Sequence, residues 1–234
     1  HNFCQIALGG TRQNGFSVTR GIRQGCPLSP LLFAAASDLL LRRLARRLPM
    51  ALLRAWADDL AVVLPNGLRQ LATLQDFFSD FERVSGLGLN IPKSVLVPLD
   101  PFDETEIRRA VAQEAPGWGG LGIATAAKYL GLYVGPGRGQ LSWQAPLQKY
   151  LERAQLWGSM GVGTLLTMQA HRVYIASVLL FVGQLEDLPP DFIIQERRAC
   201  QNLFPGPKDW ITVCCLKELR TLGFPSELQD ITST

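Results

Sequence analysis

The sequence has little excess charge, few histidines and no paired cysteine motif. Its net charge is +3 at pH 7, which gives weak support for a nucleic-acid partner and excludes none. The two histidines and five scattered cysteines, none in a C-x-x-C pair, match no common zinc-binding pattern. An odd, scattered cysteine count also fits a reducing compartment better than a disulfide framework. These absences exclude zinc modules and small disulfide-stapled domains.

Long apolar runs, repeats and low-complexity tracts are missing as well. The most apolar stretch, residues 174–182, is far shorter than the roughly 20 residues that span a bilayer, so we expect a buried helix there and no membrane partner. The chain begins without Met or a signal peptide, and we expect it to be a fragment of a longer protein. Its 234 residues are 47% apolar and 18% charged, which is globular composition.

Turn residues divide the chain into an α/β part and a helical part. The stretch GPGRG at residues 135–139 can hold neither helix nor strand, so we expect one region over residues 1–139 and a helical region over residues 140–234. Residues 9–15 (GGTRQNG) lie between two β-prone runs and predict a hairpin. In the helical region, the pattern predicts helices over residues 144–160, 165–185 and 191–204.

Within the first region, boundary residues predict two helices. Ser29 is a good N-cap and Pro30 suits the first helical position, so a helix should begin there and end near Pro49. Apolar residues at helical spacing over residues 68–84 predict an amphipathic helix, which Gly86 should end. Further along, we expect a strand at residues 90–98, a helix at 104–114 and a strand pair that ends at 128–134.

Two adjacent carboxylates are the strongest chemical feature. Asp58 and Asp59 separate two apolar β-prone runs, residues 52–57 and 60–64, which predicts a hairpin with both acids at its tip. Mg²⁺ prefers oxygen ligands and keeps several waters and substrate phosphates, so a few carboxylates suffice to hold it. Taken alone, the pair is more often turn chemistry than a metal site, because Asp is favoured in turns.

Four motifs in order change that weighting. The segments RGIRQGCPLSPLLF, AWADDLAVVL, SGLGLNIPKS and KYLGLYVG begin at residues 20, 55, 85 and 128. Together they resemble the successive palm motifs of the reverse transcriptase family, specifically the non-LTR (LINE-type) retrotransposon enzymes. The resemblance covers about residues 21–135, and the remainder is similar to the family's thumb. It implies an α+β fold: an incomplete polymerase palm, with a small antiparallel sheet and helices, followed by a helical thumb.

The resemblance also implies a function and roles for its residues. The parent would be an RNA-directed DNA polymerase that uses an RNA template, a DNA primer, deoxynucleoside triphosphates and Mg²⁺ in a two-metal mechanism. Asp58 would be a direct metal ligand, Asp59 its weaker companion, and Lys93 a charge-compensating or proton-donating group near the triphosphate. The remaining residues would contact nucleotide (Gln24, Gly25) or primer and template (Arg23, Tyr129, Leu130, Gly131).

Simpler interpretations stand beside these roles. Arg23 and Lys93 suit solvated surface positions, and Tyr129 and Leu130 suit an ordinary strand core. Cys26 is expected to be a small buried residue rather than a nucleophile. A solvated helix face is the favoured interpretation of the arginines at 42, 43, 46 and 47. Buried packing is favoured for most of the tryptophans at 118, 143, 157 and 210.

Two departures from the family pattern limit the expected activity. Trp56 stands where the family usually has Tyr or Phe, and no acidic residue precedes the R-Q-G loop, where the family carries another metal-binding aspartate. We therefore expect no polymerase activity from this chain alone. A non-catalytic nucleic-acid-binding relic and a group II intron maturase-like protein stay open as alternatives. Location stays open too, with a nuclear one expected for a retrotransposon enzyme, and missing palm strands would leave an unpaired edge prone to self-association.

Overall fold

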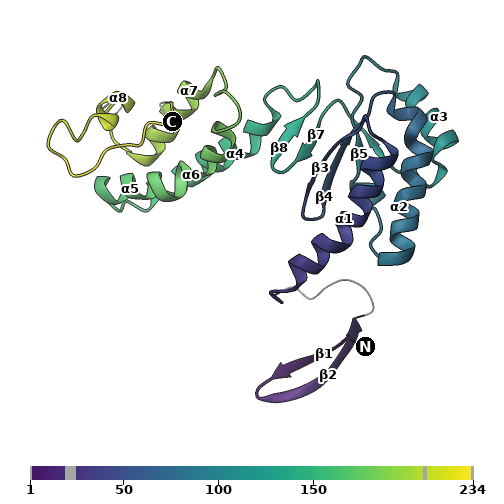
Figure 1. The fold of residues 1–234 in the computed structure, drawn as a ribbon. Helices are drawn as coiled ribbons and strands as arrows, with labels where there is room; N and C mark the ends of the chain where they lie inside the picture. The colour runs from purple at the N-terminus through teal and green to yellow at the C-terminus, as the bar shows by residue number, and fades with distance from the viewer. Residues whose placement is uncertain (1, 19–24, 208–209, 233–234) are drawn as a thin grey trace. The chain divides into compact units, whose positions relative to one another are not determined.

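The computed structural model describes residues 2–18, 25–207 and 210–232. The chain divides into two compact units, His1–Leu130 and Gly131–Thr234, which are described separately below (Figure 1). The chain combines helices with short two-stranded sheets, so the α+β class is confirmed. The predicted palm–thumb boundary at residue 139 stays a prediction, because compactness alone does not define those domains.

The N-terminal hairpin is confirmed, with a tighter turn than predicted. Strand β1 (Asn2–Leu8) pairs antiparallel with β2 (Thr11–Val18) across Gly9 and Gly10, whose φ angles of 57° and 81° suit a turn that needs two left-handed residues. Residues 11–14, predicted as loop, instead pair in β2. A bulge lies between Phe3 and Gln5, where Gly15 approaches the carbonyl oxygen of Cys4 so closely that a Cβ would clash with it.

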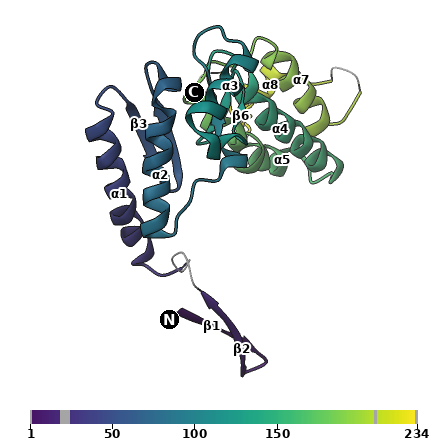
Figure 2. The same ribbon diagram turned by 90° about the vertical axis from the view of Figure 1, so that its right-hand side faces the viewer.

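Three helices build the core of the first unit. Helices α1 (Ser29–Arg47) and α2 (Leu71–Ser85) lie side by side in both views, and α3 (Glu104–Glu114) packs near α2 (Figures 1 and 2). A 3₁₀ turn, η1 (Gly67–Gln70), leads into α2, and Gly86 ends α2 with φ 72°, as predicted. The helices bury one apolar face each, which includes Leu44, Leu74, Phe77, Ile107 and Val111.

The start of α1 differs from the prediction. Leu28, with helical φ and ψ of −81° and −22°, occupies the cap position, so Ser29 is the first helical residue rather than the N-cap. Pro30 still lies in the first turn, where its missing N–H costs nothing. The helix ends at Arg47, in agreement with the stop expected near Pro49.

The strand predicted over residues 90–98 is mostly wrong. Asn90 instead caps a 3₁₀ turn, η2 (Ile91–Lys93), by accepting a hydrogen bond from the Lys93 amide at 3.3 Å. Within this segment only β5 (Val95–Leu96) forms a strand. It pairs parallel with β6 (Gly122–Ile123), which follows the turn η3 (Pro116–Trp118). The local side-chain bond outcompetes a ladder in this segment because Pro92 cannot donate to one.

The second unit is a helical assembly with a larger core. Its elements are β8 (Leu132–Val134), α4 (Leu141–Ser159), α5 (Thr164–Ala170), the π-helical turn η4 (His171–Ile175), α6 (Ser177–Gly183), α7 (Phe192–Leu203) and α8 (Val213–Lys217). Helix α4 packs against α6 and α7 around Trp143, Tyr150, Leu179 and Phe192. The helix predicted over residues 165–185 is interrupted by η4 and forms the two shorter helices α5 and α6, which are labelled in Figure 1.

The apolar stretch at residues 174–182 lies in this core, as expected. Ile175, Leu179 and Val182 are all buried there. In the described part of the chain, no single helix is long and apolar enough to cross a membrane. The pair Thr164–Ile175 and Ser177–Gly183 meets that criterion jointly, by length and composition only, with a bend of 42°.

Candidate active site

Asp58 and Asp59 lie at the tip of the predicted hairpin. Strands β3 (Leu52–Trp56) and β4 (Asp59–Val63) pair antiparallel, and Ala57 and Asp58 form the two-residue turn. Ala57 has φ 49° at the first turn position, a left-handed conformation that costs a non-glycine residue about 1–2 kcal/mol. Both carboxylates are exposed, so they are accessible to a cation or a nucleic acid.

The two faces of this hairpin have different environments. Leu53 and Leu60 point into the hydrophobic core of the first unit, which holds the strands in place. The opposite face carries Arg54, Trp56 and Asp59, because side chains alternate along a strand and Trp56 pairs directly with Asp59. Trp56 is 69% exposed. The hairpin is thus anchored on one face and open on the other, next to the carboxylates.

The donor atoms at this tip fit a hard divalent cation in part. Two adjacent carboxylates provide the oxygen ligands that Mg²⁺ prefers, and this ion takes its remaining positions from water and phosphate. Among the residues that the structure describes, no group of three or more His, Cys, Asp or Glu side chains could hold a metal. Asp58 and Asp59 can therefore supply part of a magnesium site.

Lys93 lies in the turn η2 rather than in a strand. Its side chain is exposed, and its backbone amide is fixed by Asn90. Ile91, two residues earlier, packs against the same hydrophobic core as Leu53 and Leu60 of the hairpin. The lysine turn and the carboxylate hairpin are therefore built on one core.

The R-Q-G loop is only partly described. Arg23 and Gln24 lie outside the described residues, whereas Gly25 has φ 88° and nothing within 4 Å of a Cβ built on it. Gly25 therefore meets a backbone requirement that a side chain would strain. Cys26 is exposed, so the expectation that it is a buried residue was wrong.

The Y-L-G motif forms a strained tight turn. Strand β7 (Ala127–Tyr129) leads into Leu130 and Gly131, whose φ angles are 49° and 92°, before β8. Leu130 is 38% exposed at the tip, while Tyr129 is half-buried. A left-handed leucine is uncommon and persists only where its surroundings hold it, as at many functional turns.

The other basic and aromatic candidates mostly serve structure. Arg42 pairs with Asp38, and Arg43 pairs with Asp80 at 2.8 Å while its guanidinium lies over the ring of Phe77. Among the tryptophans, Trp118 and Trp143 are buried as expected, Trp157 is half-buried and Trp210 is half-exposed. Its indole N–H donates to the Phe204 carbonyl.

Sequence reasoning missed the buried polar groups of the second unit. Tyr150 Oη lies 3.2 Å from His171 Nε2, and Lys217 Nζ lies 2.9 Å from Glu196 Oε1 and 2.7 Å from Asp230 Oδ1. Burial, aided by the charge of Lys217, lowers the pKa of His171 to about 4. These partners are 13 to 21 residues apart in the chain, so no local motif announces them.

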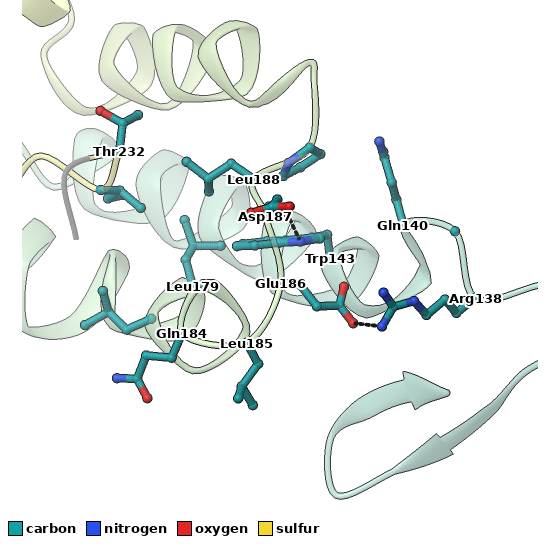
Figure 3. A pocket seen from close by; sticks show the side chains of 15 residues that line it. Arg138, Gln140, Trp143, Leu179, Gln184, Leu185, Glu186, Asp187, Leu188 and Thr232 are labelled. Atoms are coloured by element: carbon teal, nitrogen blue, oxygen red, sulfur yellow. Dashed lines mark hydrogen bonds and ion pairs between the residues drawn. The ribbon is translucent and has the colours of Figure 1, made fainter. Parts of the chain in front are cut away.

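The second unit also contains a pocket of about 760 Å³. Arg138, Trp143, Leu179 and Glu186 are among the side chains that line it (Figure 3). Glu186 accepts a hydrogen bond from Ser142, and the Trp143 indole N–H donates to the Asp187 carbonyl. The pocket is lined by residues other than those predicted for catalysis, so it is a separate feature of the helical unit.

Comparison with known proteins identifies the class. Residues 2–134, more than half of the chain, match the family model described as reverse transcriptase (RNA-dependent DNA polymerase). The chain therefore belongs to the reverse transcriptase family.

Its relatives agree with the non-LTR resemblance of the motifs. The chain is 34% identical over 102 residues to the Pol polyprotein of a type-1 R2 retrotransposable element from Popillia japonica, an alignment that covers 38% of the chain and 13% of the relative. It is 37% identical over 102 residues to the type-2 R2DM polyprotein of Drosophila melanogaster, covering 38% of the chain and 10% of that relative. The chain thus carries a non-LTR reverse transcriptase domain and spans a small part of the relatives' length.

Proposed function

We propose that this chain forms part of the palm and the thumb of an RNA-directed DNA polymerase, which extends a DNA primer by deoxynucleotides while it copies an RNA template. The observation that carries the proposal is the exposed pair Asp58 and Asp59, on a hairpin anchored by Leu53 and Leu60, in a chain of the reverse transcriptase family. A rigid support matters, because reacting groups must be held in place without cost at the moment of reaction.

Asp58 and Asp59 would hold the metal end of the site. Asp58, in the turn, and Asp59, at the start of β4, offer carboxylate oxygens to Mg²⁺. The bound ions of a two-metal site supply activation of the primer hydroxyl and stabilisation of the leaving pyrophosphate. No acidic residue precedes Asp38 in this sequence, so the two aspartates supply only part of the ligand set. The chain alone should therefore extend no primer.

The other proposed roles follow the positions of the motifs. Lys93 offers an exposed cation, which suits a triphosphate or a departing pyrophosphate. Gly25, with Gln24, would line the nucleotide pocket, and Arg23 would contact the primer or template backbone. The turn at Tyr129, Leu130 and Gly131 would hold the primer end. The open face of the β3–β4 hairpin supports placing the nucleic acid on that face, beside the carboxylates.

The test is primer extension by the intact protein with an RNA template, a DNA primer, deoxynucleotides and Mg²⁺. Asp58→Asn removes one ligand charge at nearly constant volume, and we expect activity to fall at least about 100-fold. Asp76→Asn makes the same change on the exposed side of α2 and should leave activity unchanged.

Three results would count against parts of the proposal. Full activity in Asp58→Asn would remove the aspartate from the reaction. Salt-sensitive binding of primer–template without any extension by the intact protein would instead favour the non-catalytic relic. Extension by residues 1–234 alone would contradict the expectation that further ligands are needed.

A further inference from the structure

A short hydrogen-bonded relay joins β8 to the segment after α6. The backbone N–H of Tyr133 donates to Ser142 Oγ at 2.9 Å, and the Ser142 hydroxyl donates to Glu186 Oε1 at 2.8 Å. A serine hydroxyl can accept and donate at once, and its bond to a carboxylate is charge-assisted. Ser142 is 4% exposed, so solvent water cannot readily replace either hydrogen-bond partner.

Glu186 is itself held in place. Its backbone amide donates to the Val182 carbonyl at 2.9 Å, which continues the last turn of α6. The indole N–H of Trp143 donates to the carbonyl of Asp187 at 3.0 Å, and Arg138 Nη1 lies 3.8 Å from Glu186 Oε1 (Figure 3). The carboxylate therefore presents a fixed acceptor to Ser142.

The residues tied by this relay directly follow the tip of the Y-L-G turn. A Cβ built on Gly131 would lie 3.1 Å from Cε1 of Phe181, and Leu132 packs against the core of the second unit. The Tyr133 amide bond and the packing of Leu132 hold the two residues after Gly131, and Phe181 leaves little room for a side chain at position 131 itself. The backbone that directly follows the turn is therefore held by groups outside the motif.

We propose that Glu186 is a positioning residue for the primer-holding turn and acts through Ser142 on the backbone of β8. This deepens the proposed function and rests on it, because the turn's role toward the primer belongs to that proposal. Without the carboxylate, the buried Ser142 hydroxyl loses its acceptor and turns toward other partners, so the Tyr133 amide loses a fixed acceptor. The turn then samples positions that fit the primer end less well.

The test is steady-state primer extension by the intact protein and four variants. Glu186→Ala and Ser142→Ala should raise KM for primer–template about tenfold, as expected for one lost buried hydrogen bond, with kcat and KM for the nucleotide unchanged. Glu186→Gln retains an acceptor oxygen and should restore most of the affinity. Glu152→Ala removes an exposed carboxylate of α4 and should match the unchanged protein.

Hydrogen exchange of the Tyr133 amide provides a readout independent of catalysis. Exchange should be faster in Ser142→Ala and Glu186→Ala than in Glu152→Ala or in the unchanged protein. An unchanged KM in Glu186→Ala, with an active parent, would overturn the inference and leave the proposed function intact. An equal rise of KM in Glu152→Ala, or unchanged Tyr133 exchange, would overturn it too. If the unchanged intact protein extends no primer, both this inference and the proposed function fail.

Discussion

The two units differ in how completely they bury their large side chains. Of the largest fully buried side chains among the described residues, ten belong to the second unit, and Leu44 is the only member from the first. Both units also expose large apolar groups, such as Leu39 and Trp56 in the first and Leu166 and Ile193 in the second. The first unit presents its motifs on a smaller buried core, whereas the second unit has a larger one.

One ion pair from each unit shows a similar difference in burial. In the first unit, Arg43 pairs with Asp80, and their side chains are 49% and 38% exposed. Pairs this exposed contribute little to stability. In the second unit, Lys217 pairs with Glu196, and their side chains are only 19% and 4% exposed. Although burial opposes the charge, hydrogen bonds to Asp230 and Glu196 raise the pKa of Lys217. A buried pair costs much to break even where it gains little by forming.

The largest stability effect should come from Lys217→Ala. The change leaves Glu196 buried and without its cation, so the opening free energy of the second unit should fall by about 3–5 kcal/mol. Hydrogen exchange with mass spectrometry measures this in peptides of each unit separately. The matched change Arg43→Ala should lower the opening free energy of the first unit by at most about 1 kcal/mol. Equal losses in both units would break the comparison.

A smaller effect should follow from acidification. The pKa of His171 is lowered to about 4 by burial and then by Lys217, so the unfolded chain binds a proton more readily than the folded one between pH 4 and 6.5. This stability is complete above the ordinary histidine pKa and is lost as pH falls toward 4. From pH 7 to pH 5, the second unit should lose roughly 2 kcal/mol.

Urea denaturation at both pH values measures this loss. His171→Gln should remove the dependence over this range, although the variant is less stable at pH 7, and His1→Gln should retain it. If His171→Gln loses as much stability on acidification as the unchanged chain, then other groups cause the loss and protonation of His171 does not contribute to it.

Local signals predicted much of the first unit and of the candidate site. Pro49 and Gly86 gave the helix ends, Asp103 caps α3 at the predicted start, and the Asp58–Asp59 hairpin forms between its apolar runs. Each of these features depends on residues within one turn or one hairpin. The metal and primer roles remain predictions, since they depend on partners beyond the chain.

Features that depend on competing or distant partners were not predictable. Asn90 diverts its segment into a 3₁₀ turn although the composition favours a strand. No local pattern announces the π-helical turn at His171, and Lys217 pairs with Glu196 across 21 positions. Ser142 and Glu186 are 44 positions apart, so their bond has no signature in either local sequence.

The smallest predicted effect tests the hairpin tip itself. Ala57→Gly relieves a left-handed alanine, so the β3–β4 hairpin should gain about 0.5–1 kcal/mol, despite the greater freedom of glycine in the unfolded chain. Ala61→Gly, in regular β4, should cost a similar amount, which hydrogen exchange of the hairpin amides would resolve as opposite signs. If both changes destabilise the hairpin, contacts outside the turn hold Ala57. The backbone beside Asp58 would then be held by packing, as residues in the core of the second unit are.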